Sequence, residues 1–168
     1  MNLIFLFSTL FLFVILCTLS IIDVRKQIIN IKILLSAQFY ILFIHPISQK
    51  IFFKEDLFAN FIERITASSV TLISLLIVSI LVSKIISKEA LGHGDILLAS
   101  MGSAWIGISG IFIALGFAFL LAGLKDFARM IFQQKIQPTP FAPYLSLSIF
   151  GVWILGDELI DMLLNMFF

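Results

Sequence analysis

Charge is scarce in this sequence, and the scarcity excludes several classes of protein. Only 12% of the 168 residues are Asp, Glu, Lys or Arg, about half the share of an ordinary soluble domain. Hydrophobic residues make up 61% of the chain, and the mean hydropathy is +1.14. A chain of this length has too little interior to bury so much apolar surface. A cytosolic enzyme, a disordered tail and a nucleic-acid-binding protein are therefore excluded, and an integral membrane protein is indicated.

Cysteine is almost absent as well. Cys17 is the single cysteine, so no internal disulfide can form, and no Cys/His cluster predicts a structural metal site. The net charge of +1 favours no polyanionic partner. The chain also lacks an internal repeat, a low-complexity tract or a linker. We therefore expect a single membrane-embedded domain over residues 1–168.

Long apolar runs are what the sequence has in abundance. A helical span needs ~20 mainly apolar residues, and Leu3–Ile22 provides them. No Lys or Arg precedes this run and no small-residue cleavage site closes it, so we expect a retained first span rather than a secretory signal. Further runs cover Ile33–Ile47, Ile65–Val82 and Phe141–Leu155, and a polar stretch, Gln49–Arg64, precedes the third run.

One further uncharged run, Ile96–Leu124, is too long for one untilted span. At ~1.5 Å per residue a single helix would reach ~43 Å, beyond a hydrocarbon core of ~30 Å. Two glycines and an interfacial-type Trp interrupt it at Trp105–Gly110, and we predict two short passes or a re-entrant hairpin that turns there. With this turn the basic loops share one side of the membrane, which is then the cytoplasmic side. The predicted fold class is all-α, a polytopic membrane protein with about six transmembrane helices and both termini outside.

Two aspartates stand out against this background. Asp23 ends the first span and Asp95 begins the fourth, both at the predicted cytoplasmic edge. Ionisable side chains at membrane depth are costly and by default mark a functional site. A second interpretation of Asp23 stays open, in which the side chain sits in headgroup water or pairs with Lys26 and has no catalytic role.

Asp95 lies in the segment Gly92-His93-Gly94-Asp95. The glycines permit a positive φ and a close approach to another helix, which would bring the Asp95 carboxylate near a partner such as Asp23. Two carboxylates in a low-dielectric site tend to share one proton, so one acts as a general base on water while the other donates. This is the arrangement of aspartic proteases, and it requires neither a metal nor a nucleophilic serine.

A third feature is the proline-rich segment Pro138–Tyr144, which holds three prolines. Prolines at this density forbid a continuous helix and fix where the last span begins. The segment is either an ordinary helix start or a rigid extended piece of chain that lines the site on the cytoplasmic face. The sequence leaves both interpretations open.

Together these segments resemble the prepilin peptidase family, the type IV leader peptidases among the GxGD-type membrane aspartyl proteases. The stretch from Asp23 to Asn30 is similar to the family's first Asp motif. Gly92–Asp95 matches its GxGD sequence, and Pro140–Tyr144 is similar to its late Pro-Phe-Gly-Pro segment. These matches occur in the family's order and cover nearly the whole chain.

The resemblance implies an aspartic-type endopeptidase of the bacterial inner membrane, with its active site on the cytoplasmic side. The substrate would be a type IV prepilin or pseudopilin in the lipid bilayer, cut after a Gly that precedes a hydrophobic helix. No cofactor, metal or nucleic acid is implied. The implied site residues are catalytic Asp23 and Asp95, with Gly92, Gly94, Pro140, Phe141 and Pro143 shaping or supporting the substrate cleft.

Two positions depart from the family pattern. Asn30 lacks the Pro that precedes it in the family, and Leu97 stands where the family has Lys. Neither removes a carboxylate, but both leave an alternative open, a catalytically inactive membrane scaffold or small carrier that retains the peptidase architecture. The longer members add a cysteine-bearing N-terminal domain and methylate the product. With one cysteine and a span at its start, this chain resembles the short form, and no methyltransferase activity is expected.

Overall fold

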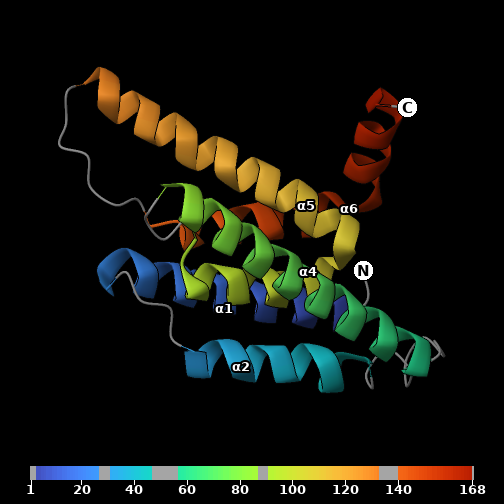
Figure 1. Cartoon of the computed structure of the whole chain (residues 1–168). Helices are drawn as coiled ribbons and strands as arrows, with labels where there is room; N and C mark the ends of the chain where they lie inside the picture. Colours follow the sequence, from blue (N-terminus) through green and yellow to red (C-terminus); the bar gives the residue numbers. More distant parts are fainter. Residues whose placement is uncertain (1–2, 27–30, 47–56, 87–90, 133–139, 168) are drawn as a thin grey trace.

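The computed structural model describes residues 3–26, 31–46, 57–86, 91–132 and 140–167. Within these ranges all regular secondary structure is helical and no strand occurs, which confirms the predicted all-α class. The helices, shown in Figure 1, are α1 (Leu3–Lys26), α2 (Ile31–Phe39) continued by the π-helix η1 (Tyr40–Ile44), α4 (Leu57–Ile86), α5 (His93–Ile131) and α6 (Ala142–Phe167).

Three helices are long and apolar enough to cross a membrane: Phe7–Arg25 in α1, Leu57–Ile85 in α4 and His93–Ile131 in α5. Two shorter apolar helices, Ile31–Ile44 and Ala142–Gly156, accompany them. Helices satisfy their own main-chain hydrogen bonds and are therefore suited to lipid. These findings support a multi-pass membrane protein, while the count of six passes stays a prediction.

The helix α5 is broken at Gly107, where φ is 78° and ψ is 174°. This combination is essentially restricted to glycine. Figure 1 shows the chain reversing its direction at the break. The prediction that the long run is interrupted within Trp105–Gly110 is therefore confirmed. Residues 93–106 are called the first half of α5 below, and residues 108–131 its second half.

The first half of α5 lies at the centre of the bundle. Most of its side chains are buried, and α5 packs most extensively against α4 and α6. Its approach to α6 is close, because a Cβ atom added at Gly102 would lie 2.5 Å from Cδ1 of Ile149. Glycine at this position therefore allows the two backbones to come together.

A seam of hydroxyl groups joins α4 to the first half of α5. The Oγ atoms of Ser68 and Ser100 lie 2.8 Å apart, and the Thr71 hydroxyl donates to Ser103 Oγ at 2.8 Å. From α2, Gln38 Nε2 donates to Ser68 Oγ at 2.8 Å. Helix association in lipid relies on close packing and interhelical hydrogen bonds. The seam therefore fixes the position of the first half of α5 along α4.

Two helix boundaries differ from the predicted runs. The helix α4 begins at Leu57, inside the stretch predicted as a polar connection, Gln49–Arg64. Arg64 is tolerated within the helix because its Nη1 donates to the main-chain oxygen of Ala104 at 2.9 Å. The last helix continues past the predicted end at Leu155, with a break at Gly156, where φ is 55°.

Trp105, which the sequence suggested as an interfacial residue, is buried by other side chains. Its side chain is 5% exposed and lies within an aromatic cluster. Its ring centroid is 5.1 Å from that of His45, 5.6 Å from that of Trp153 and 6.5 Å from that of Tyr40. Packing beside the Gly107 turn, rather than contact with lipid headgroups, accounts for its burial.

Candidate active site

Three helix ends that are distant in sequence meet at one end of the bundle. Figure 1 shows the C-terminal end of α1 beside the N-terminal ends of α5 and α6, at the left of the view. Asp23 lies in the last turn of α1, and Asp95 lies in the first turn of α5. The topology therefore brings the two predicted catalytic residues to the same end of the molecule.

Asp23 is buried and held by the main chain of α6. Its side chain is 7% exposed, and its Oδ2 accepts a hydrogen bond of 3.3 Å from the amide nitrogen of Ala142. The structure thus buries the Asp23 carboxylate against α6 instead of leaving it exposed. The alternative pairing with Lys26 stays untested, because the Lys26 side chain lies outside the described part of the structure.

The start of α6 explains why the Ala142 amide points at Asp23. The Phe141 oxygen accepts hydrogen bonds of 3.1 Å from the amides of Tyr144 and Leu145. Pro143 has no amide hydrogen, so Ala142 supplies a first-turn donor that the helix itself cannot satisfy. The positive end of the helix dipole also favours a carboxylate there. The prolines thus make an ordinary helix start that is also a binding site for the Asp23 side chain.

Asp95 is positioned by the loop that opens α5. The amides of Asp95 and Ile96 donate to the Gly92 oxygen at 3.0 and 3.2 Å. The Asp95 carboxylate folds back over Gly92, since a Cβ added there would lie 3.2 Å from Asp95 Oδ2. The carboxylate is also close enough to Asp23 for their charges to interact. The two acids therefore lie within range of each other's charge.

The expected positive φ at the GxGD glycines is wrong. Gly92 has a φ of −65°, and Gly94 lies in the first turn of α5. Among the described glycines, positive φ occurs at Gly107 and Gly156. What Gly92 supplies is room for the Asp95 carboxylate, because any side chain would press against it.

The remaining predicted residues surround the start of α6. Pro140 and Phe141 precede the helix and Pro143 lies in its first turn. The Phe141 ring packs against Phe119 in the second half of α5, with a centroid distance of 4.9 Å. Leu97, which departs from the family pattern, packs against the hydrophobic core. The other departure, at Asn30, and the first proline of the segment, Pro138, lie outside the described residues.

The chemistry available at this end of the bundle is that of carboxyl groups. Among the described residues, no three His, Cys, Asp or Glu side chains gather where they could hold a metal ion. Two juxtaposed carboxyl groups, one protonated and one not, can activate a water molecule and protonate a peptide carbonyl. The arrangement therefore fits peptide hydrolysis by general acid and base catalysis.

Three structural contributions were missed in the sequence. The hydroxyl seam has a recognisable signal, since Ser68 and Thr71 on α4 have the same three-residue spacing as Ser100 and Ser103 on α5. Arg64, which binds the end of the first half of α5, lies in the stretch that the sequence predicts as a polar connection. No sequence signal could have indicated the Ala142 amide, because almost every residue type carries the same main-chain donor.

Comparison with known proteins finds one matching family profile and a similar protein. The profile of the type IV leader peptidase family matches residues 10–125, a region that contains both aspartates and ends before Pro140. A prepilin leader peptidase/N-methyltransferase of Xanthomonas campestris pv. campestris is 33% identical over 99 residues. That match covers 56% of this chain and 33% of the relative, so the chain spans about a third of the relative's length. No solved structure matches the chain significantly.

Proposed function

This chain belongs to the type IV leader peptidase family, and on that premise we propose that it is an intramembrane aspartyl endopeptidase. Its substrates would be type IV prepilin-like precursors, whose leader it removes at the cytoplasmic face of a bacterial inner membrane. Asp23 and Asp95 are the proposed catalytic residues. The proposal covers the peptidase step alone.

The observation that carries this proposal is a buried acid, Asp23, next to a half-buried one, Asp95, at one end of a helix bundle. Asp23 is 7% exposed, and the charges of Asp23 and Asp95 interact. Holding two carboxylates near each other in a partly buried place is costly, and the hydrogen bond of Asp23 to the start of α6 does not require a second acid beside it. A catalytic role explains why the chain retains this arrangement.

The proposed reaction needs one unprotonated and one protonated carboxyl group. The unprotonated one removes a proton from a water molecule, whose oxygen then attacks the carbonyl carbon of the scissile peptide bond. The protonated one donates to the carbonyl oxygen. When the C–N bond breaks, a proton passes to the leaving amine, and the pair returns to its original protonation state.

Two neighbouring groups would keep these carboxyl groups in place. The Ala142 amide donates to Oδ2 of Asp23, and the proposed reaction would use the other oxygen, Oδ1. Gly92 leaves the space that the Asp95 carboxylate occupies. Positioned acids and bases are far more effective than freely moving ones, so both groups are expected to matter for the rate.

The proposed cytoplasmic side rests on the distribution of basic residues. Arg25 lies near the end of α1, Lys84 near the end of α4, and Lys125 and Arg129 near the end of α5. Lys125 Nζ lies 5.3 Å from the ring centroid of Tyr144 at the start of α6, beside the candidate site. Basic residues flanking spans favour the cytoplasm, so the end that carries the two aspartates is the proposed cytoplasmic end.

The proposal is tested by co-expressing the chain with a panel of epitope-tagged prepilins and measuring precursor masses. The native chain should shorten at least one precursor, whereas Asp23→Asn and Asp95→Asn should leave it intact. A chelator should not prevent cleavage, since the mechanism uses no metal.

Two other results would contradict the proposal. Cleavage that survives either substitution would exclude the carboxylate pair as the catalyst. A well-inserted native chain that cuts no precursor would favour the inactive scaffold or carrier that the changes at Asn30 and Leu97 left open.

A further inference from the structure

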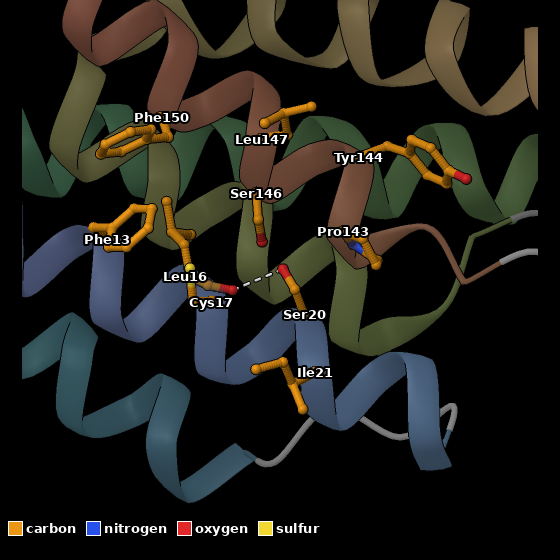
Figure 2. Close-up of a pocket in the computed structure, with 10 residues that line it drawn as sticks. All are labelled: Phe13, Leu16, Cys17, Ser20, Ile21, Pro143, Tyr144, Ser146, Leu147 and Phe150. Carbon is orange, nitrogen blue, oxygen red and sulfur yellow. Dashed lines mark hydrogen bonds between the residues drawn. The ribbon is translucent and has the colours of Figure 1, made fainter.

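A groove lies between α1 and α6, directly beside the candidate active site. Figure 2 shows it with its lining residues, and its volume is about 380 Å³. This is within the range of ~300–1,000 Å³ that is usual for binding pockets. Pro143, at one end of the groove, is the residue after Ala142, whose amide binds Asp23.

One wall of the groove is a face of α1. It consists of Phe13, Leu16, Cys17, Ser20 and Ile21, which recur with the spacing of a single helix face. At ~1.5 Å per residue this wall is ~12 Å long, or about two helical turns. It ends less than one turn before Asp23, so the groove runs from the carboxylates toward the middle of the span.

The opposite wall comes from α6 and closes the groove at its far end. The Phe150 ring lies 5.1 Å from the Phe13 ring, centroid to centroid, and Figure 2 shows this pair at the end away from Pro143. Leu147 is 62% exposed and Phe13 is 48% exposed, so the rim faces the surroundings of the bundle. The groove is thus open to the lipid side and leads to the acids.

The floor of the groove contains a hydroxyl group with no internal partner. Ser146 is 4% exposed, and its Oγ makes no hydrogen bond with any described residue. Figure 2 shows this hydroxyl directed from α6 toward α1, in the lining of the groove. Ser20, on the other wall, instead donates to the main-chain oxygen of Leu16 at 2.7 Å. A buried hydroxyl without a partner is costly, which points to a polar group supplied by a ligand.

We propose that this α1–α6 groove docks the apolar helix that adjoins the cleaved bond of the precursor; this rests on the proposed function. A groove of two turns fits a helix that inserts residues i, i+3 or i+4, and i+7. The first turn of such a helix has amide groups with no partner within the helix. Ser146 Oγ accepts a hydrogen bond from one of these amides.

The choice of a helix over a lipid chain follows from the physics of the bilayer. Apolar walls alone do not distinguish a helix from acyl chains, because both are equally hydrophobic. Small residues at a helix interface permit close packing, and polar ones add hydrogen bonds. Cys17, Ser20 and Ser146 supply both properties, whereas an acyl chain has no group that could bind the Ser146 hydroxyl.

Cross-linking through Cys17, the single cysteine of the chain, tests the docking directly. The full chain carrying Asp95→Asn is placed in vesicles with precursors that bear one cysteine at successive positions of the apolar helix, and a mild oxidant is added. Disulfides to Cys17 should form with a period of three to four residues. The control carries Cys17→Ser and Ile77→Cys, which moves the thiol to α4, where Ile77 is 52% exposed. Uniform cross-linking, or equal cross-linking from position 77, overturns the proposal.

Cleavage kinetics of variants within the groove supply the second measurement. Cys17→Phe fills the groove and should raise KM for the precursor at least about tenfold, whereas Ile77→Phe, which adds a ring to the exposed face of α4, should not. Ser146→Ala should raise KM by a smaller factor. An unchanged KM for Cys17→Phe overturns the groove and leaves the proposed function intact. A native chain that cuts no precursor overturns both. If Cys17→Phe does not fold, the cross-linking pattern of Cys17 still decides whether the helix of the precursor docks in the groove.

Discussion

The two ends of the first half of α5 carry opposite charges and serve different purposes. Its N-terminal end bears Asp95 next to Asp23, and its C-terminal end is bound by Arg64 through the Ala104 oxygen. Both charges suit the helix dipole, which is positive at the N-terminus and negative at the C-terminus. The difference lies in the neighbours, because the cation meets a hydrogen-bond acceptor while the acid meets a second acid.

This comparison separates what stabilises the fold from what the proposed reaction needs. The Arg64 contact satisfies a carbonyl that the break at Gly107 would otherwise leave unpaired. Asp95 lies at the start of α5 and Asp23 binds the start of α6, so each acid suits its own helix, but their proximity adds a repulsion that neither helix start needs. Variants at the Arg64 end should therefore lose stability, and variants at the aspartate end should lose activity.

The largest effect is expected from Asp95→Asn, which should abolish cleavage without lowering stability. The amide keeps the size of the side chain and removes the charge that interacts with Asp23. Because like charges in a low-dielectric site repel, the melting temperature should stay the same or rise. The melting temperature is measured by thermal unfolding in detergent, with tryptophan fluorescence as the signal. A clear fall in melting temperature would mean that Asp95 is needed for folding.

Ala142→Pro should lower the cleavage rate while leaving α6 in place. Proline is accepted at the first helical position, so the helix start is kept, while the donor to Asp23 is replaced by the Cδ of the ring at a position that is fully buried. A hydrogen bond to a charged group is worth ~1.5–3 kcal/mol, so kcat should fall about tenfold to a hundredfold. The matched variant Ala142→Gly keeps the amide and should retain most of the rate. Equal losses in both variants would mean that the hydrogen bond from the Ala142 amide is not what sustains the rate.

Gly107→Ala should destabilise the hairpin through backbone strain alone. No heavy atom lies within 4 Å of the added Cβ, but φ is +78°, a conformation that costs other residues ~1–3 kcal/mol. Gly116 in the second half of α5 has equally open space and no positive φ. Gly116→Ala should therefore leave stability unchanged or raise it by ~0.5–1 kcal/mol. Unfolding in increasing denaturant measures the change in stability of both variants. A change of the same sign in both would argue against backbone strain at the Gly107 turn.

Ser100→Ala should have the smallest effect, a loss of stability of ~0.6 kcal/mol, the average for interhelical hydrogen bonds in membranes. The Ser100 hydroxyl forms hydrogen bonds with two groups of Ser68 on α4, the side-chain Oγ and the main-chain oxygen. Ser74 donates only within its own helix, to the Thr71 oxygen at 3.0 Å. Ser74→Ala should thus leave stability unchanged in the same unfolding measurement. A larger loss of stability for Ser74→Ala than for Ser100→Ala would mean that the hydroxyl seam does not stabilise the packing of α4 against α5.

The sequence predicted the features that depend on local rules. Long apolar runs gave the helices, the glycines near Trp105 gave the break at Gly107, and an acid at each of two span ends gave Asp23 and Asp95. These signals are visible because charge and glycine are unusual inside a span.

The features that were missed depend on tertiary contacts. Arg64 looked like the end of a polar connection because hydropathy does not register a distant carbonyl that can bind its guanidinium. The aromatic cluster that buries Trp105 was missed for the same reason. The Ala142 amide could not be found from residue types at all.

The most direct test of the central claim compares the two ends of the first half of α5 in one assay. Purified native chain, Asp23→Asn, Asp95→Asn and Arg64→Leu are reconstituted in vesicles with a cleavable precursor, and activity is divided by the folded fraction. We predict no activity for either aspartate variant and near-native activity per folded molecule for Arg64→Leu. Cleavage by an aspartate variant, or a folded Arg64→Leu chain that is as inactive as the aspartate variants, would contradict the division between a catalytic and a structural end.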